Sequence, residues 1–207
     1  MTIKQPQFRL RRETTKLTTR PTASWHTFND QIDPHAIISL LPIHRSQHVA
    51  VLGGRVDGLT IPIAKYVYDG NVIALDSDQS TLDELATEVN HLHLTNVVPQ
   101  LIENDDIEGT ELDTDGIVVI DALHNTTSPA RLFSSVAKLL PGGGWLLIAD
   151  WFSTDARGDT GPAKSKRVDP SRVERWAAEH DMTPITRRTL GVQRYVHVYR
   201  KRRTSSN

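Results

Sequence analysis

Residues 48–76, HVAVLGGRVDGLTIPIAKYVYDGNVIALD, contain two short apolar runs separated by a glycine-rich turn and an amphipathic segment. The first run, 48–53, predicts a buried strand that enters the turn, and the second, 71–75, predicts a buried strand that ends at Asp76. Apolar residues recur at helical spacing over 59–67, which predicts a helix between the two strands. This order indicates neighbouring parallel strands joined by a crossover helix.

The rest of the chain continues the same alternation of strands and helices. We expect helices over 33–41, 80–94, 129–140 and 169–180, and strands over 96–102, 116–120, 145–149, 183–190 and 192–199. Asp33-Pro34 and Asp169-Pro170 are typical helix starts, with the aspartate as N-cap. The pattern predicts an α/β fold with a mostly parallel sheet covered on both faces. The last two strands have no helix between them, so we expect them to pair antiparallel.

Composition narrows the class of protein. The chain has 207 residues, 38% apolar and 24% charged, which suits one globular domain. It has no cysteine, which excludes a disulfide framework, a thiolate nucleophile and a cysteine-ligated zinc site. No apolar run approaches the ~18 residues of a membrane span, and residues 1–20 are too polar for a secretory signal. We therefore expect a soluble, cytoplasmic protein with no membrane partner.

Basic residues gather at the two ends of the sequence. Residues 1–24 carry six bases and one acid, and residues 187–203 carry seven bases and no acid. Such ends attract nucleic acid, although solvated termini that complement an acidic body are the commoner explanation. We expect a basic N-terminal arm over 1–24, one domain over 25–203 and a polar tail over 204–207.

The turn at Gly53 and the acid at Asp76 indicate a nucleotide-type ligand. A glycine turn after the first strand lets a ligand approach the backbone, and the following helix presents unpaired N–H groups. Asp76 comes 23 residues after Gly53, at the end of the second strand, where it is placed to accept hydrogen bonds from ribose hydroxyls. Glycine-rich turns that bind nothing are also common, so the turn alone leaves the question open.

Five further segments resemble a known family. They are GLTIPIAK at 58–65, GNVIALD at 70–76, LHN at 123–125, LLPGGG at 139–144, and GP at 161–162 with RVDP at 167–170. In this order they resemble class I S-adenosylmethionine-dependent methyltransferases, above all the small prokaryotic ones akin to ubiquinone and menaquinone biosynthesis enzymes. The resemblance covers residues 28–201. It implies a Rossmann-like three-layer sandwich with a seven-stranded sheet, six strands parallel and the last antiparallel, and the cofactor across the carboxyl ends of the first strands.

The resemblance also implies site residues. S-adenosylmethionine, or the product S-adenosylhomocysteine, would contact Gly53, Gly54, Arg55, Asp76, Ser77, Glu103, Asn104 and Asp121, and His124 would face a small-molecule substrate. For several of these residues another explanation stands beside this one. Asp76 and Ser77 also suit a helix cap, Glu103 and Asn104 lie in an acidic loop, and His124 also suits a structural role. His91 and His93 have no third ligand at a recognisable spacing, so no metal is predicted.

The glycine motif departs from the family. Its pattern, acid-x-Gly-x-Gly-x-Gly, falls on Val51, Gly53, Arg55 and Asp57, so one glycine of three remains. Arg55 is suited to attract the methionine carboxylate of the cofactor, whereas Asp57 would repel it. Two functions therefore stay open: a methyltransferase acting on a small molecule, and a non-catalytic relative used in binding or assembly, in either case with homo-oligomerisation possible. A nicotinamide oxidoreductase is disfavoured, because no Tyr is followed by Lys four residues later and the middle glycine of G-x-G-x-x-G is missing.

Overall fold

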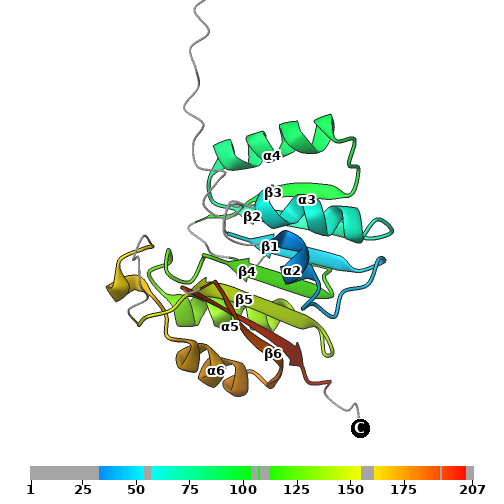
Figure 1. Ribbon diagram of the computed structural model, residues 1–207. Helices are drawn as coiled ribbons and strands as arrows, with labels where there is room; N and C mark the ends of the chain where they lie inside the picture. Colours follow the sequence, from blue (N-terminus) through cyan, green and yellow to red (C-terminus); the bar gives the residue numbers. More distant parts are fainter. Residues whose placement is uncertain are drawn as a thin grey trace, which may run out of the picture.

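The computed structural model describes residues 33–53, 57–103, 107, 112–154, 161–191 and 193–203. Within these ranges it forms one seven-stranded sheet in the order β3-β2-β1-β4-β5-β7-β6 (Figure 1). The strands are β1 His48–Leu52, β2 Asn71–Asp76, β3 Val97–Leu101, β4 Gly116–Ile120, β5 Trp145–Trp151, β6 Met182–Leu190 and β7 Arg194–Lys201. The helices are α2 Pro34–Ile38, α3 Asp57–Tyr66, α4 Gln79–His91, α5 Pro129–Leu139 and α6 Pro170–Glu179, with a short 3₁₀ helix, η1, at Lys164–Lys166.

Strand direction matches the sequence-based prediction. The pairs β1–β2, β1–β4, β2–β3 and β4–β5 are all parallel. Strand β7 pairs antiparallel with both β5 and β6, so it alone among these strands runs against the others. The carboxyl ends of the six parallel strands therefore lie at one edge of the sheet, which we call the carboxyl edge. The predicted fold class, with an antiparallel last strand, is confirmed.

Each face of the sheet carries its own hydrophobic core. Helices α2, α3 and α4 pack on one face, where Ile37, Leu59 and Leu85 meet alternate residues of the strands. Helices α5 and α6 cover the other face around Phe133 and Trp176 (Figure 1). Strand β4 is buried at every position because it lies in the middle of the sheet with helices on both sides. The result is the predicted three-layer sandwich.

The helix caps are mostly the predicted ones. The side chains of Asp33 and Asp169 accept hydrogen bonds from the backbone N–H groups of His35 and Ser171 and so cap α2 and α6. The cap of α4 is Asp78, which accepts from the N–H of Ser80 at 2.9 Å, rather than Asp76 or Ser77. Helix α4 ends at His91, before the predicted end at residue 94, because the chain turns at His93 with φ 55°.

The ends of the chain lie outside the described residues. These include the predicted basic arm over 1–24 and the polar tail over 204–207, which both stay predictions. Among the described helices, none combines the length and the hydrophobicity that crossing a bilayer requires.

Candidate functional site

Strand register brings Gly53 and Asp76 together at the carboxyl edge. Leu52 of β1 is aligned with Leu75 of β2 and with Val119 of β4. The next residue on each strand continues this alignment, so Gly53 follows beside Asp76 on one side and Ile120 on the other. Neighbouring strands are about 4.8 Å apart. Two of the residues predicted to contact the cofactor are therefore neighbours across adjacent strands.

Gly53 cannot be replaced by a larger residue without moving β4. Its φ is +79°, in the left-handed region that favours glycine. A Cβ at this position would lie 2.5 Å from the carbonyl oxygen of Ile120 and 2.9 Å from the Cβ of Ala122. Gly53 thus lies tightly against the end of β4. The predicted residues Gly54 and Arg55, and the side chain of Asp57, lie outside the described residues.

Asp76 is half-buried and held in place by the turn that follows it. Its Oδ1 accepts a hydrogen bond from the backbone N–H of Asp78 at 3.0 Å. Since Asp78 caps α4, the side chain of Asp76 is not needed for that cap. Ser77 is exposed beside it. Glu103, just after β3, is exposed as well, and Asn104 lies outside the described residues.

Asp121 forms an ion pair that the sequence did not predict. Ile120 is aligned with Ala149, and Trp151 with Arg194, so the ends of β4 and β5 and the start of β7 meet at the carboxyl edge. The guanidinium of Arg194 donates from NH2 to Oδ2 of Asp121 at 2.8 Å and from Nε to Oδ1 at 3.2 Å. Burial raises the pKa of Asp121, and Arg194 opposes that rise.

His124 is held by a carboxylate that the sequence reasoning missed. Its Nδ1 lies 2.8 Å from Oδ1 of Asp150, and its backbone N–H donates to Oδ2 of the same residue at 3.3 Å. Asp150 is 0% exposed and His124 is 8% exposed. A carboxylate only accepts, so Nδ1 carries the hydrogen and Nε2 is the ring nitrogen left to accept a proton. Nε2 has no hydrogen-bond partner in the part of the chain that the structure describes.

Asp121, His124 and Asp150 also lie close enough to act as metal ligands. One ligand atom from each falls within 4.8 Å of the others. Arg194 already bonds both oxygens of Asp121, and Oδ1 of Asp150 accepts the backbone N–H of Trp151 as well as the imidazole. A divalent cation here would have to displace a guanidinium. The arrangement therefore favours a hydrogen-bonded network over a metal centre.

Trp151 covers the end of β5 next to this network. The guanidinium carbon of Arg194 lies 4.1 Å from the centre of its ring, and that of Arg167 lies 5.4 Å away. Gly161 approaches so closely that a Cβ there would lie 2.5 Å from the ring. The tryptophan is buried, so it packs within the protein.

No protein-family model matches this sequence, and no curated protein matches it. Solved structures do match in fold. A SAM-dependent methyltransferase from Aquifex aeolicus is 18% identical, with a TM-score of 0.71, over 83% of this chain and 90% of that one. The [4+2]-cyclase SpnF is 9% identical with a TM-score of 0.71, over 83% of this chain and 80% of that one. The fibrillarin pre-rRNA processing protein of Methanococcus jannaschii is 15% identical with a TM-score of 0.61, over 79% and 70%.

These likenesses establish the fold but do not identify the reaction, because one fold hosts several functions. The chain has the Rossmann-like fold found in class I S-adenosylmethionine-dependent methyltransferases.

Proposed function

We propose that this chain is an S-adenosylmethionine-dependent methyltransferase whose acceptor is a small molecule that loses a proton during methyl transfer. One observation carries the proposal. The carboxyl edge holds the Gly53 turn beside Asp76, and on the neighbouring strands of the same edge it holds a histidine paired with a buried carboxylate. Gly53 and Asp76 suit a cofactor that contains a ribose, and the paired histidine suits the uptake of a proton from the acceptor.

The described residues fit the cofactor. Asp76 is partly exposed at the end of β2, where its carboxylate can accept hydrogen bonds from two ribose hydroxyls. Gly53 itself carries no side chain that would keep a ligand away from its backbone. Ser77 and Glu103 are exposed at the same edge and suit the adenine. Gly54, Arg55 and Asn104 belong to the proposal through the resemblance of the sequence. When bound, the cofactor supplies an electrophilic methyl group on a sulfonium.

His124 is the proposed proton acceptor, through Nε2. Asp150 is a positioning residue: it fixes the tautomer and the orientation of the ring and stabilises the charge that the ring gains. Asp121 is occupied by Arg194 and therefore acts by closing this end of the site, where Trp151 and Arg194 exclude water. Most of the rate enhancement would come from holding methyl donor and acceptor in line.

Calorimetry with S-adenosylhomocysteine tests the cofactor site. We expect micromolar binding to the whole chain and a loss of at least about tenfold in Asp76→Ala, since hydrogen bonds to a charged group are removed. Asp113→Ala is the matched control, because Asp113 is exposed just before β4, at the opposite edge of the sheet. The control should bind like the unchanged protein. Absence of binding at millimolar ligand contradicts the proposal and favours the non-catalytic alternative.

A further inference from the structure

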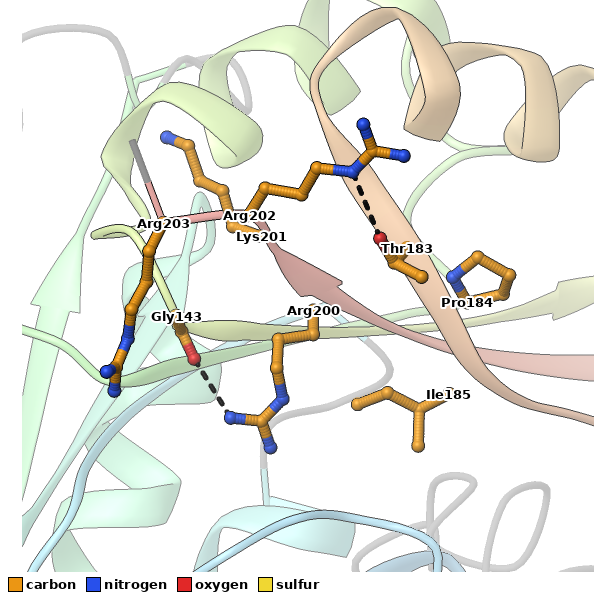
Figure 2. A pocket seen from close by; sticks show the side chains of 8 residues that line it. All are labelled: Gly143, Thr183, Pro184, Ile185, Arg200, Lys201, Arg202 and Arg203. Atoms are coloured by element: carbon orange, nitrogen blue, oxygen red, sulfur yellow. Dashed lines mark hydrogen bonds between the residues drawn. The ribbon is translucent and has the colours of Figure 1, made fainter. Parts of the chain in front are cut away.

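A pocket opens at the edge of the sheet opposite to the carboxyl edge. Gly143 precedes β5, residues 183–185 lie near the start of β6, and residues 200–203 lie at and just after the end of the antiparallel strand β7, so all of them reach this opposite edge. The pocket has a volume of about 400 Å³ (Figure 2). This falls within the range of small-molecule sites, roughly 300–1,000 Å³. The proposed methyl transfer uses none of its residues.

The basic residues of the pocket divide into two groups. Lys201 is structural, because its Nζ donates to the carbonyl oxygens of Ala137 and Leu140 at the end of α5. Arg202 reaches across to the hydroxyl of Thr183, with Nε at 3.4 Å. Arg200 and Arg203 extend to the other side of the strands, on either side of the carbonyl of Gly143 (Figure 2). The guanidinium groups of Arg200 and Arg203 therefore line one side of the pocket.

Among the described residues, no carboxylate pairs with either of these two arginines. Arg200 donates from NH1 to the carbonyl oxygen of Gly143 at 3.1 Å, which leaves its other N–H groups for a ligand. Asp181 acts on Lys201 rather than on these two arginines: its negative charge raises the pKa of Lys201, against the lowering that burial causes. An anion entering the pocket would thus meet two guanidinium groups that no carboxylate of the described residues pairs with.

The remaining wall of the pocket is apolar. It is formed by Pro184 and by Ile185, whose side chain is 44% exposed although it belongs to a strand. In Figure 2 the side chain of Ile185 lies on the same side of the strands as the guanidinium groups of Arg200 and Arg203. Two arginines beside an exposed apolar surface suit a ligand that carries both a phosphate and a flat or apolar body.

We propose that this pocket binds a small phosphorylated organic molecule of nucleotide size, with its phosphate between Arg200 and Arg203 and its body against Pro184 and Ile185. The N-terminal residues 1–24 do not complement the pocket, because they are themselves basic. A long nucleic acid track along the same hairpin is disfavoured, because Arg187 is already paired with Glu174 at 2.8 Å and Arg194 with Asp121.

Titration with uridine 5′-monophosphate tests the proposal. This nucleotide lacks adenine, and adding S-adenosylhomocysteine in excess keeps the carboxyl-edge site out of the measurement. We expect one site per chain, bound more tightly than either uridine or inorganic phosphate alone. The double variant Arg200→Gln/Arg203→Gln should weaken binding at least about tenfold. Arg188→Gln is the matched control, since Arg188 is exposed on β6 away from the pocket, and it should bind like the unchanged protein.

Four results overturn the proposal. The first is no binding of the nucleotide at millimolar concentration. The second is that uridine binds as tightly as the nucleotide, which would mean that the phosphate does not contribute to binding. The third is that inorganic phosphate binds as tightly as the nucleotide, which would mean that the apolar wall does not contribute to binding. The fourth is much tighter binding of a short oligouridylate with a steep salt dependence, which points to a polyanion surface. Circular dichroism of the double variant checks that the exposed substitutions leave the fold intact.

Discussion

Arg194 and Asp121, 73 positions apart in the sequence, form a two-point ion pair in which the guanidinium is 5% exposed and the carboxylate 15% exposed. The pair joins the first residue of β7 to the residue that follows β4. Asp121 adopts φ +49°, a left-handed conformation that aspartate and asparagine tolerate better than most residues. The turn after β4 therefore depends on both the backbone preference and the charge of Asp121.

Removing one member of this pair should destabilise the protein strongly. Arg194→Leu leaves a buried carboxylate without its partner, and we expect a loss of about 3–5 kcal/mol in the free energy of unfolding. Asp121→Asn alone should also destabilise, because it removes the carboxylate charge that the buried guanidinium binds. The double variant Arg194→Leu/Asp121→Asn buries neither charge, so it should be more stable than the sum of the single changes implies. Urea denaturation measures all four proteins, and additive effects would contradict the coupling.

The effect of Arg194→Leu should also depend on pH. Burial raises the pKa of Asp121 in the folded protein, so the folded state takes up its proton at higher pH than the unfolded chain does. The stability contributed by this group is therefore complete at low pH and is lost as pH rises through the raised pKa. Because Arg194 opposes the rise, Arg194→Leu raises that pKa further.

We therefore expect the stability that Arg194→Leu loses relative to the unchanged protein to become smaller as pH falls from neutral through the raised pKa of Asp121, because the carboxyl becomes protonated. The double variant Arg194→Leu/Asp121→Asn lacks the titrating carboxyl, so its loss of stability relative to the unchanged protein should change much less with pH. Comparing variants at each pH cancels the other acids of the chain. If the stability lost in Arg194→Leu stays constant as pH falls, Asp121 is not the group that titrates.

The pairing of His124 with Asp150 predicts a specific kinetic pattern. Once an acceptor is found by screening phenols, thiols and amines for release of S-adenosylhomocysteine, His124→Gln should lower kcat by about 10²-fold or more. Its affinity for S-adenosylhomocysteine should stay the same. Asp150→Asn should lower kcat less and move the acidic limb of the pH–rate profile to lower pH, because it removes the counter-charge of the imidazolium. An unchanged profile in Asp150→Asn would assign Asp150 a structural role only.

The sequence predicts elements well here and side-chain pairs poorly, for a physical reason. Strands such as 116–120 and helix starts such as Asp169-Pro170 are set by residues within a few positions of each other. The closeness of Gly53 and Asp76 was also predictable, because Gly53 follows one strand and Asp76 ends the next strand of the same βαβ unit. Their proximity follows from the parallel direction of the two strands.

Asp150 and Arg194 escaped prediction because their roles depend on register between distant strands. The apolar run suggested that a strand ends at residue 149, whereas β5 continues to Trp151 and buries Asp150 completely. An acid is compatible with this position only because the imidazole and the backbone N–H of His124 reach it from 26 residues away. A basic run over 187–203 likewise gave no sign that Arg194 would be buried while Arg200 stays exposed.

Tyr195 and Tyr199 offer a comparison between a hydroxyl with a partner and one without. Both side chains are buried on β7. Among the described residues, the hydroxyl of Tyr195 has no hydrogen-bond partner, whereas that of Tyr199 lies 2.9 Å from Nδ1 of His197. Burial raises the pKa of both phenols, so both stay neutral. We expect Tyr195→Phe to leave stability unchanged or to raise it by up to about 1 kcal/mol, because it removes an unsatisfied polar group.

Tyr199→Phe should instead lower stability by about 0.5–1.5 kcal/mol, the usual net value of one hydrogen bond. Thermal unfolding of the two variants at equal concentration gives the comparison. A loss of similar size in both would mean that Tyr195 has a partner of its own.

Gly116 should tolerate substitution poorly. It begins β4 against the indole of Trp145, and a Cβ at Gly116 would collide with the six-membered ring of that indole. Trp145 has little room to move, since it is buried and its Nε1 donates to Oε1 of Gln47 at 3.2 Å. We expect Gly116→Ala to lower the free energy of unfolding by about 1–3 kcal/mol or more through overpacking.

Two comparisons separate this collision from the general effect of replacing glycine. Gly191 has φ +58° but no atom within 4 Å of a Cβ, so Gly191→Ala should cost only the left-handed strain, about 1–2 kcal/mol. In a Trp145→Phe background the ring is smaller, so Gly116→Ala should cost clearly less than it does beside the indole. Urea denaturation of the single and double variants measures the coupling. If Gly116→Ala costs the same in both backgrounds, the collision with Trp145 is not what makes Gly116 necessary.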